Sequence, residues 1–363
     1  MADYDAFLLV SFGGPEGPDD VMPFLQNVTR GRGIPPERLE AVAEHYYAVG
    51  GISPINQQCR DLIAAIGKDF ATAGVDLPIY WGNRNWDPYL TATVAEMAAA
   101  GVRRALAFVT SAYGSYSSCR QYLDDIERAR AEAGPGAPQI DKIRHFYSHP
   151  GFTGPFADAT LRAIESLPAG IRADVPLVFT AHSVPEAMAA ASGPPPGGRY
   201  PAQLAEAAGL IAGRVNGAAG PAGEAGGHPW RLVYQSRSGP PSQPWLGPDV
   251  CDYLEELARD GAPGAVLVPV GFITDHMEVV HDLDVEAAQL AQRLGLPLAR
   301  AATPGQDPRF ASMITALVGE RLAGERPGSG LPPAALGSPG CGSADCCRPP
   351  TPAGRPGRPA AAS

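Results

Sequence analysis

Short runs of apolar residues recur along the chain and alternate with longer stretches whose apolar positions follow helical spacing. The short runs are rich in Val, Leu and Phe, which is typical of strands buried on both faces of a parallel sheet. We expect such strands at residues 6–12, 77–82, 105–111, 176–183, 231–238 and 265–272. The longer stretches, such as 61–74, 90–101 and 251–261, predict helices, and the alternation indicates an α/β fold with parallel sheets.

The alternation falls into two similar halves, which we expect to be domains covering residues 1–160 and 161–325. The last helix of the second half is expected to pack back on the first. In open parallel sheets, ligands bind outside the carboxyl ends of the strands. We therefore expect one cleft lined by the segments that follow strands, namely SFGG, TSAYGSYSS, TAHS, QSRSGP and GFITDHME.

The composition changes after residue 325, where Pro, Gly, Ala and Ser dominate, so 326–363 is expected to be a tail outside both domains. Three of the six cysteines, Cys341, Cys346 and Cys347, crowd into this tail. Soft thiolates favour zinc or an iron–sulfur cluster, and either needs four ligands. The tail supplies three, so a structural zinc, a cluster and spare thiols all remain open at this point.

Charge and hydropathy exclude several classes of partner. The net charge is −10 and no dense Lys/Arg run occurs, so a nucleic-acid partner is not expected. The apolar runs fall short of the ~18 residues that span a membrane, and the run at residues 6–12 has no basic leader, so stable membrane insertion is not expected and the cytoplasm is the expected location. The glycines of SFGGPEGP fit neither nucleotide-binding motif, so no nucleotide cofactor is expected.

The candidate chemistry lies in two segments that follow strands. TAHSVPE places His182 at a strand end, and TDHMEVVHDLDVE carries Glu278, Asp282 and Glu286. If the second segment is helical, these carboxylates fall at i, i+4 and i+8 on one face. Such a row is often only a solvated surface. Beside a histidine it also suits a partly hydrated divalent cation, because oxygen ligands suit such ions.

With these residues the chain resembles the ferrochelatase family over nearly its whole length. The resemblance rests on LLVSFGGP, GGISP (50–54), FTAHSVPE, YQSRSGP with PWLGP (234–248), and ITDHMEVVHDLD, in the family's order and spacing. It implies a lyase-type enzyme with two Rossmann-like domains facing across a porphyrin cleft. Fe²⁺ would be the metal substrate, inserted into the porphyrin with release of two protons.

The resemblance also implies roles for single residues. The family's histidine falls on His182 and its acidic partner on Glu278, so these are the expected catalytic pair. The row through Asp282 and Glu286 would guide iron to them. Residues expected to contact the porphyrin are Phe12, Arg30, Arg32, Ser53, Tyr113, Tyr116, Trp245 and His276.

One expected contact departs from other branches of the family. Certain relatives carry a tyrosine at the position of Phe12, where it ligates the inserted iron, and a phenylalanine cannot do so. Tyr116 is our candidate for that axial position. Several ferrochelatases hold a 2Fe-2S cluster on three C-terminal cysteines and one internal cysteine, which predicts Cys341, Cys346 and Cys347 with Cys119 here.

The substrate expected from the sequence is coproporphyrin III, which carries four propionates. The segment 21–40 contains Arg30 and Arg32 and lacks a long apolar stripe, so it suits a carboxylate clamp. The look-alikes with this composition and cysteine spacing belong to a bacterial branch whose product goes on to a decarboxylase, an expected partner. Alternatives are protoporphyrin IX as substrate, a cobalt or nickel chelatase acting on a sirohydrochlorin-type ring, and an inactive iron–sulfur sensor.

Overall fold

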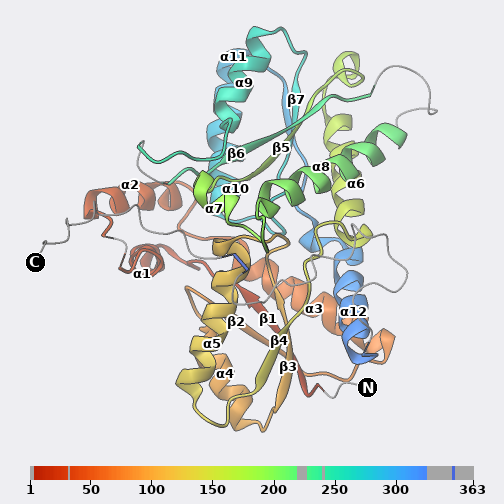
Figure 1. Cartoon of the computed structure of the whole chain (residues 1–363). Coiled ribbons are helices and arrows are strands. Elements are labelled where there is room, and N and C mark those ends of the chain that lie inside the picture. Colours follow the sequence, from red (N-terminus) through yellow and green to blue (C-terminus); the bar gives the residue numbers. More distant parts are fainter. Residues whose placement is uncertain (1–3, 32, 219–226, 239–241, 325–345, 348–363) are drawn as a thin grey trace, which may run out of the picture.

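The computed structural model describes residues 4–31, 33–218, 227–238, 242–324 and 346–347. Two four-stranded parallel sheets, one from each half of the chain, form its centre, and Figure 1 shows them one above the other with helices around them. The α/β fold predicted from the strand–helix alternation is therefore confirmed. Each of the predicted strands is present, with ends that differ by at most four residues.

The two sheets share one topology, in which the first strand of each half lies inside the sheet beside the third. The first sheet has the order β2 (Ile79–Asn83), β1 (Ala6–Ser11), β3 (Arg104–Val109) and β4 (Gln139–Lys142). The second has the order β6 (Trp230–Gln235), β5 (Leu177–His182), β7 (Ala265–Val268) and β8 (Leu298–Arg300). Because all neighbours are parallel, the carboxyl ends of each sheet meet at one edge.

The strands β4 and β8 were not predicted. Both are short, pair on one side only, and lack a continuous apolar run, since β4 reads QIDK and β8 reads LAR. The strand β1, by contrast, is AFLLVS and buried throughout. Hydrophobic pattern therefore identifies the central strands of these sheets and misses their edges.

Helices cover both faces of the sheets. In the first half they are α1 (Pro18–Val28), α2 (Pro36–Tyr47), α3 (Ile55–Ala73), α4 (Leu90–Ala99), the π-helix η1 (Tyr116–Arg120) and α5 (Gln121–Ala133). In the second half they are α6 (Pro150–Ser166), the 3₁₀ turn η2 (Ala169–Ile171), α7 (Glu186–Ala190), α8 (Arg199–Ala218), α9 (Val250–Arg259), α10 (Met277–Val279), the π-helix η3 (Val280–Ala287), α11 (Ala288–Leu294), the 3₁₀ turn η4 (Pro304–Gln306) and α12 (Pro308–Leu322).

The last helix, α12, lies against α3 of the first half and α6 of the second. Ser312 Oγ donates to Asp69 Oδ1 at 2.8 Å, and Arg321 donates to the Tyr4 hydroxyl at 2.9 Å. Beneath it, the rings of Phe108 and Phe146 stack with centroids 4.8 Å apart. Because burial of one such side chain stabilises a fold by about 1.5–3 kcal/mol, this shared core fixes how the two sheets sit.

Two contacts join the halves where their strands end. The Tyr113 hydroxyl, from the loop after β3, donates to the carbonyl of Val270 after β7 at 2.7 Å. The amide of Asp275 donates to Gln58 Oε1 of α3 at 2.9 Å. The carboxyl edges of the two sheets are thereby held facing each other.

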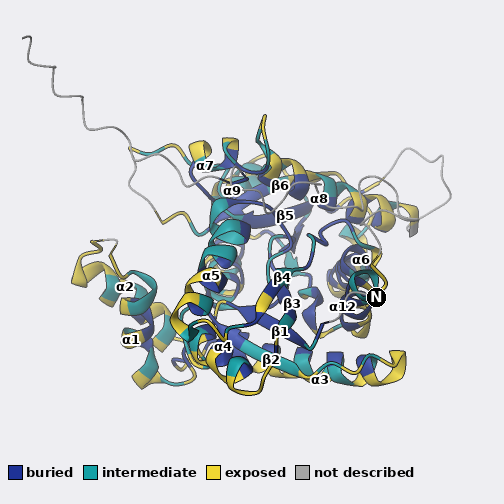
Figure 2. Cartoon of the chain, turned by 60° about the horizontal axis from the view of Figure 1, so that its bottom comes forward, coloured by how far each residue is buried: buried dark blue, intermediate teal, exposed yellow. Residues whose placement is uncertain are grey.

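The helices α1 and α2 stand to one side of the sheets, and Figure 2 shows α2 largely exposed. They pack on each other through a small core of their own, built from Val21, Phe24, Leu25 and Ala43. Among the described residues, no helix is both long and apolar enough to cross a membrane. The pair of helices therefore forms a lip beside the facing sheet edges.

Candidate active site

His182 is the last residue of β5, and hydrogen bonds hold both its backbone and its imidazole ring. The Tyr200 hydroxyl donates to the His182 carbonyl at 2.8 Å, and His182 Nδ1 lies within hydrogen-bond distance of the Ser183 carbonyl. A carbonyl oxygen only accepts, so Nδ1 carries the hydrogen when the imidazole is neutral. The lone pair of Nε2 is then left for a proton from the cleft.

Glu278 faces that nitrogen. Its Oε1 lies 3.4 Å from His182 Nε2, and the two side chains are 46% and 32% exposed. Glu278 sits in the first turn of α10, whose N-cap is His276, with His276 Nδ1 accepting from the Glu278 amide at 3.2 Å. The structure thus brings together His182, His276 and Glu278 from two segments far apart in sequence.

The charges of this pair determine one another. Burial alone lowers the pKa of His182, but the adjacent Glu278 carboxylate outweighs it and raises that pKa to about 9. Burial likewise raises the pKa of Glu278, and the imidazolium overrides it and lowers the pKa to about 2. Without a cation in the cleft, the resting pair at neutral pH is therefore an imidazolium beside a carboxylate.

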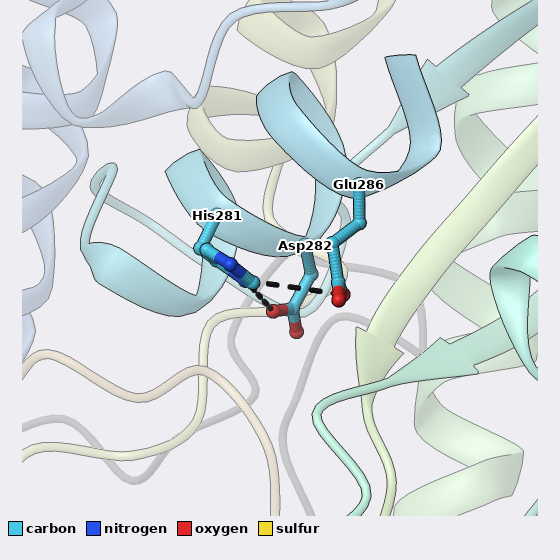
Figure 3. Close-up of side chains that lie close together, drawn as sticks. All are labelled: His281, Asp282 and Glu286. Atoms are coloured by element: carbon cyan, nitrogen blue, oxygen red, sulfur yellow. Dashed lines mark hydrogen bonds and ion pairs between the residues drawn. The ribbon is translucent and has the colours of Figure 1, made fainter. Parts of the chain in front are cut away.

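The carboxylate row continues from Glu278 along η3, where Figure 3 shows Asp282 and Glu286. This segment is a π-helix over Val280–Ala287, where the sequence had suggested ordinary helical spacing. Asp282 accepts from Ser236 Oγ and, at 3.4 Å, from Gln235 Nε2, and the same Gln235 nitrogen donates to the Glu278 carbonyl at 2.7 Å. The end of β6 therefore holds the row in place, while Glu286 is 57% exposed at its outer end.

The segment 244–248 is hydrogen-bonded to the histidine loop, which we define as residues 182–186. The Leu246 amide donates to the Val184 carbonyl at 3.0 Å, and Ser183 Oγ donates to the Leu246 carbonyl at 2.8 Å. Between them, Trp245 forms a bridge with Pro185. The indole N–H of Trp245 is buried and has no hydrogen-bond partner among the described residues. A buried donor left unpaired is costly, and a bound ligand is one way to satisfy it.

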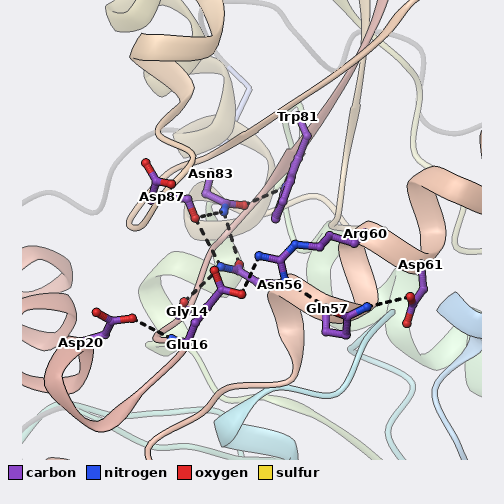
Figure 4. Close-up of polar contacts among 10 residues, drawn as sticks. All are labelled: Gly14, Glu16, Asp20, Asn56, Gln57, Arg60, Asp61, Trp81, Asn83 and Asp87. Carbon is purple, nitrogen blue, oxygen red and sulfur yellow. Dashed lines mark hydrogen bonds and ion pairs between the residues drawn. The ribbon is translucent and has the colours of Figure 1, made fainter.

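In the first half, the loop after β1 has a backbone that demands glycine. Gly13 has φ +81°, and a Cβ at Gly14 would lie 2.7 Å from Ser53 Cβ. Figure 4 shows the polar contacts beneath this loop: Asn56 Nδ2 donates to the Gly14 carbonyl at 3.3 Å, and Asn83 Nδ2 donates to Asn56 Oδ1 at 3.3 Å. The loop is therefore fixed closely against α3.

Aromatic side chains surround this loop and face the lip. Phe24 contacts the rings of Phe12, Tyr46 and Trp86, with centroids 6.3, 6.1 and 6.0 Å away. Phe12 is 37% exposed. Burial raises the pKa of Tyr46, and the nearby Glu278 carboxylate raises it further. These four residues are called the aromatic wall below, and the charge of Glu278 acts on one of them, Tyr46.

Arg30 follows α1 at the end of this wall. It is exposed, and its positive charge opposes the burial that raises the pKa of Tyr89. Tyr89 in turn lies 6.4 Å from Trp86, measured between ring centroids. The charge of Arg30 thus acts on Tyr89, a neighbour of Trp86, while Arg32 and Cys341 lie outside the described residues.

Three further residues were predicted to contact the porphyrin, namely Ser53, Tyr113 and Tyr116. Ser53 is buried, and its amide donates to the Pro15 carbonyl at 2.8 Å. Tyr113 is 2% exposed and packs between the two halves, so this conformation offers none of its surface to a ligand. Tyr116 is partly exposed at the start of η1. Contact of these residues with a porphyrin stays a prediction.

Cysteines gather beside η1. Cys119 is buried in η1, and the Sγ atoms of Cys346 and Cys347 lie 3.8 Å apart. The Gly193 amide donates to Cys347 Sγ at 3.0 Å. Burial raises the pKa of the Cys347 thiol, and the neighbouring Cys346 and Cys119 thiols raise it further. The two tail cysteines that the structure describes therefore lie close to the internal cysteine predicted from the sequence.

The sequence interpretation missed several residues of the site. Gln235 and Ser236 hold the carboxylate row, and His281 in η3 stacks on His45 of α2 with ring centroids 3.7 Å apart. His281 and Glu286 are five residues apart, a spacing that joins neighbours only in a π-helix. Reading the segment as an α-helix therefore hid His281.

The comparison with family models gives one match. A model described as Ferrochelatase matches residues 4–322, which is most of the described chain. The match spans both sheets, the histidine loop and the carboxylate row.

Comparison with curated proteins gives similar chains from several bacteria. The chain is 53% identical over 342 residues to "Coproporphyrin III ferrochelatase" of Streptomyces coelicolor, covering 92% of this chain and 90% of that protein. It is 52% identical over 365 residues to the protein of the same name from Nocardia farcinica, covering 97% and 99%. It is 50% identical over 371 residues to "Ferrochelatase" of Rhodopirellula baltica, covering 98% of each.

Proposed function

The chain belongs to the ferrochelatase family, and from that premise we propose that it inserts Fe²⁺ into coproporphyrin III to give iron coproporphyrin. The observation that carries the proposal is the His182–Glu278 pair, in which Glu278 Oε1 lies 3.4 Å from His182 Nε2. The reaction forms iron–nitrogen bonds and breaks two pyrrole N–H bonds. It is a lyase-type step that needs a proton acceptor and a route for the metal.

We assign to His182 the acceptance of both pyrrole protons, one after the other, with Glu278 passing each proton on to solvent before the next is taken. The Nε2 atom of His182 is the imidazole nitrogen left open once Nδ1 donates to Ser183. In the resting pair this nitrogen is protonated, because Glu278 raises the pKa of His182. A cation that reaches Glu278 competes with the imidazolium for the carboxylate, lowers the pKa of His182 and frees the base. Arrival of iron and readiness to accept a proton are therefore coupled.

The carboxylate row is the proposed route of iron. Glu278, Asp282 and Glu286 follow one another along α10 and η3, starting at the catalytic pair and ending at the exposed Glu286, with Asp282 fixed by Ser236 and Gln235. Carboxylate oxygens suit a partly hydrated divalent cation. Each step inward would replace water by protein oxygen, so the ion loses its hydration gradually.

The aromatic wall and Trp245 are the proposed faces for the macrocycle. Flat aromatic surfaces bind a porphyrin by dispersion and apolar burial. We place the substrate between Phe12 on the first half and Trp245 with His276 on the second. The unpaired indole N–H of Trp245 supports this placement, because a substrate group would satisfy it. Tyr116 is the proposed axial ligand of the inserted iron, since Phe12 has no ligand atom.

Coproporphyrin differs from protoporphyrin by two additional propionates in place of vinyl groups. The exposed Arg30, whose charge acts on Tyr89 next to Trp86, supports the choice of coproporphyrin, because guanidinium groups pair with carboxylates. The names of the relatives from Streptomyces and Nocardia support it too. We further propose that the reaction takes place in the cytoplasm. An oxidative decarboxylase would then consume the product, since each of two propionates must lose CO₂ together with one hydrogen and two electrons, which pass to a two-electron oxidant, to become a vinyl group.

The substrate is tested by kcat/KM for Fe²⁺ insertion into the two porphyrins, measured without oxygen in one detergent-free buffer. We expect coproporphyrin III to be favoured about fivefold, because its two additional propionates can form exposed ion pairs that contribute about 0.2–1 kcal/mol each. Comparable or better turnover of protoporphyrin IX would overturn the choice of porphyrin. The more general proposal, that the protein inserts iron into a porphyrin, would still stand.

We also propose that the protein holds a 2Fe-2S cluster on Cys119, Cys341, Cys346 and Cys347. The proximity of Cys119 to Cys346 and Cys347, all buried, fits such a group, and the Gly193 amide would stabilise a thiolate at Cys347. A cluster of this type supplies a one-electron redox centre. Cys59, hydrogen-bonded to Ser11, and Cys251 on α9 lie in other parts of the molecule.

The cluster is tested by colour and by iron and sulfide content. We expect a reddish-brown protein with about two irons and two sulfides per chain, as the cluster type requires. Serine at Cys119, Cys346 or Cys347 should bleach it, while the matched change Cys251→Ser should not. Colour that survives Cys119→Ser would show that the internal ligand is another residue.

A further inference from the structure

Two asparagines are buried together at the carboxyl edge of the first sheet. Asn56 lies in the first turn of α3 and Asn83 ends β2, and they are 0% and 1% exposed. Asn83 Nδ2 donates to Asn56 Oδ1 at 3.3 Å, and Trp81 Nε1 donates to Asn83 Oδ1 at 3.1 Å, as Figure 4 shows. We call Trp81, Asn83 and Asn56 the polar chain, because each side chain donates to the next.

The polar chain ends on backbone carbonyls of two loops. Asn56 Nδ2 donates to the carbonyls of Gly14 and Asp87, both at 3.3 Å. Asn83 Nδ2 donates to the same Asp87 carbonyl at 3.1 Å. Because a carbonyl only accepts, these bonds use all four hydrogens of the two side-chain amides and fix the orientation of each amide. Neither a carboxylic acid nor an apolar side chain can make the same set of bonds.

The two loops held in this way carry rings of the aromatic wall. Phe12 lies two residues before the first of these carbonyls, and Trp86 lies immediately before the second. The loops also bond to each other, since the Asn85 amide donates to the Phe12 carbonyl at 3.1 Å. Both rings therefore stand on backbone that the polar chain holds.

The lip is attached to the same support. Asn27 of α1 donates from Nδ2 to the Asn85 carbonyl at 2.8 Å. The same helix carries Phe24, whose ring contacts those of Phe12 and Trp86. A buried polar network whose members are all paired holds the groups that it joins in one arrangement. Three of the four rings of the aromatic wall are therefore placed by one network.

We propose that Asn56 and Asn83 are positioning residues for porphyrin binding, which fix the aromatic wall in its binding shape before the substrate arrives. The inference rests on the proposed function, because it takes the wall as a face for the macrocycle. A wall formed in advance binds more tightly, because binding does not have to supply the cost of ordering the loops. Loss of the network should therefore raise Kd and KM for porphyrin far more than it lowers kcat, since His182 and Glu278 lie in the other half.

The test compares three variants of the full chain in fluorescence titrations with coproporphyrin III, without iron. Asn56→Ala removes the three hydrogen bonds of this side chain, and we expect Kd to rise roughly fivefold or more. Asn56→Asp keeps nearly the same shape, but burial favours the neutral acid, which has one O–H where the amide has two N–H, so its Kd should rise less. Trp81→Phe removes only the first donor and should raise Kd about twofold. It decides the question if neither Asn56 variant folds.

Hydrogen exchange followed by NMR gives a readout that does not involve porphyrin. The Asn85 amide, which donates to the Phe12 carbonyl, should exchange faster in each variant because the two loops separate more often. Ile66→Val is the matched control. Ile66 is buried on the same helix α3, so the change lowers stability while the polar chain stays intact. It should leave both Kd and the exchange of Asn85 unchanged.

Unchanged Kd for porphyrin in every variant that folds would overturn the proposal. An equal rise of Kd in Ile66→Val would overturn it too, because the effect would then reflect stability alone. Failure of the wild-type protein to bind or metallate coproporphyrin III would instead overturn the proposed function. The exchange of the Asn85 amide would still report whether the polar chain holds the loops, so the two failures are distinguishable.

Discussion

The carboxyl edges of the two sheets have the same strand order and carry different chemistry. After β1 the chain presents Phe12 and two glycines, and aromatic rings from the lip complete the wall. At the matching place β5 ends in His182, which faces Glu278. The repeated fold therefore sets two equivalent positions. One half uses its position to shape a surface and the other to handle protons and metal.

Electrostatics follows the same division. On the wall side the buried charges cancel, since Arg84 pairs with Asp125 and both side chains are less than a tenth exposed. On the other side Glu278, Asp282 and Glu286 share one helix without a Lys or Arg paired to any of them among the described residues. The His182 imidazolium offsets the charge of Glu278, and a visiting cation would offset the charges of Asp282 and Glu286. The comparison predicts that substitutions in the second half alter the rate of metallation and KM for Fe²⁺, whereas substitutions in the first half alter KM for porphyrin and stability.

The largest effect is expected at His182. His182→Ala should reduce metallation about 10²–10⁴-fold, because a general base is lost, while binding of porphyrin to the wall remains. The checks are single-turnover metallation and fluorescence titration of the porphyrin. A variant that retains more than about a tenth of the wild-type rate would show that His182 is not the general base, because loss of a general base lowers the rate at least about 100-fold.

The carboxylate row should respond in a graded way. Glu278→Gln should lower kcat strongly, because it removes the group that faces His182 Nε2. Asp282→Asn and Glu286→Gln should mainly raise KM for Fe²⁺, since they lie further out. Steady-state kinetics at varied Fe²⁺ gives both quantities. Equal effects at all three positions would contradict an ordered route.

A change of shape in the first half should act on the wall and on stability. Gly14→Ala places a Cβ 2.7 Å from Ser53 Cβ and 2.8 Å from Ile55 Cγ2. Overpacking of this kind costs about 1–3 kcal/mol, so the free energy of unfolding should fall by that amount in a urea titration. KM for porphyrin should rise, with the pH dependence of kcat/KM unchanged. Gly17→Ala, where a Cβ meets open space, is the control.

The smallest effect is expected at Arg30. Arg30→Ala should raise KM for coproporphyrin III about two- to fivefold, since an exposed ion pair contributes about 0.2–1 kcal/mol. KM for protoporphyrin IX should change less. Arg103→Ala, whose side chain is 83% exposed at the opposite end of β3, is the matched control. Equal changes for the two porphyrins would show that Arg30 does not select propionates.

Much of the fold could be predicted because the central strands are buried on both faces. The apolar run AFLLVS predicts a buried strand, whereas QIDK and LAR are too short and too polar to be distinguished from loops. The packing of Tyr113 could not be predicted from the sequence either. A tyrosine after a strand could face the cleft or the core, and the partner that decides it, the Val270 carbonyl, lies in the other half.

The site was predictable where motif and geometry agree. His182 and Glu278 stand at segment ends that the topology must bring to one edge, and the structure places them 3.4 Å apart. His281 was missed because the residues that share a helix face depend on the type of helix. The sequence pattern does not distinguish a π-helix from an α-helix over residues 280–287. Gln235 and Ser236 were missed because their role is to hold Asp282, a contact that appears only once β5 and β6 pair.

The central claim is that neutral His182 takes the pyrrole proton. Its pKa is raised from 6.5 to about 9, so the neutral fraction and kcat/KM should rise together with pH over that window, while Glu278, with its pKa lowered to about 2, stays ionised throughout. The same shift means that the protonated form stabilises the fold below pH 6.5, and that this contribution is lost as pH rises through 9.

The most direct test compares two midpoints in wild type and in Asp282→Asn. One is the pKa of the His182 imidazole from nitrogen-15 NMR, and the other is the midpoint of kcat/KM against pH. Asp282 is one of the negative charges that raise the pKa of His182, so its neutralisation should lower both midpoints by the same amount. A kinetic midpoint that stays fixed while the imidazole pKa falls would contradict His182 as the proton acceptor.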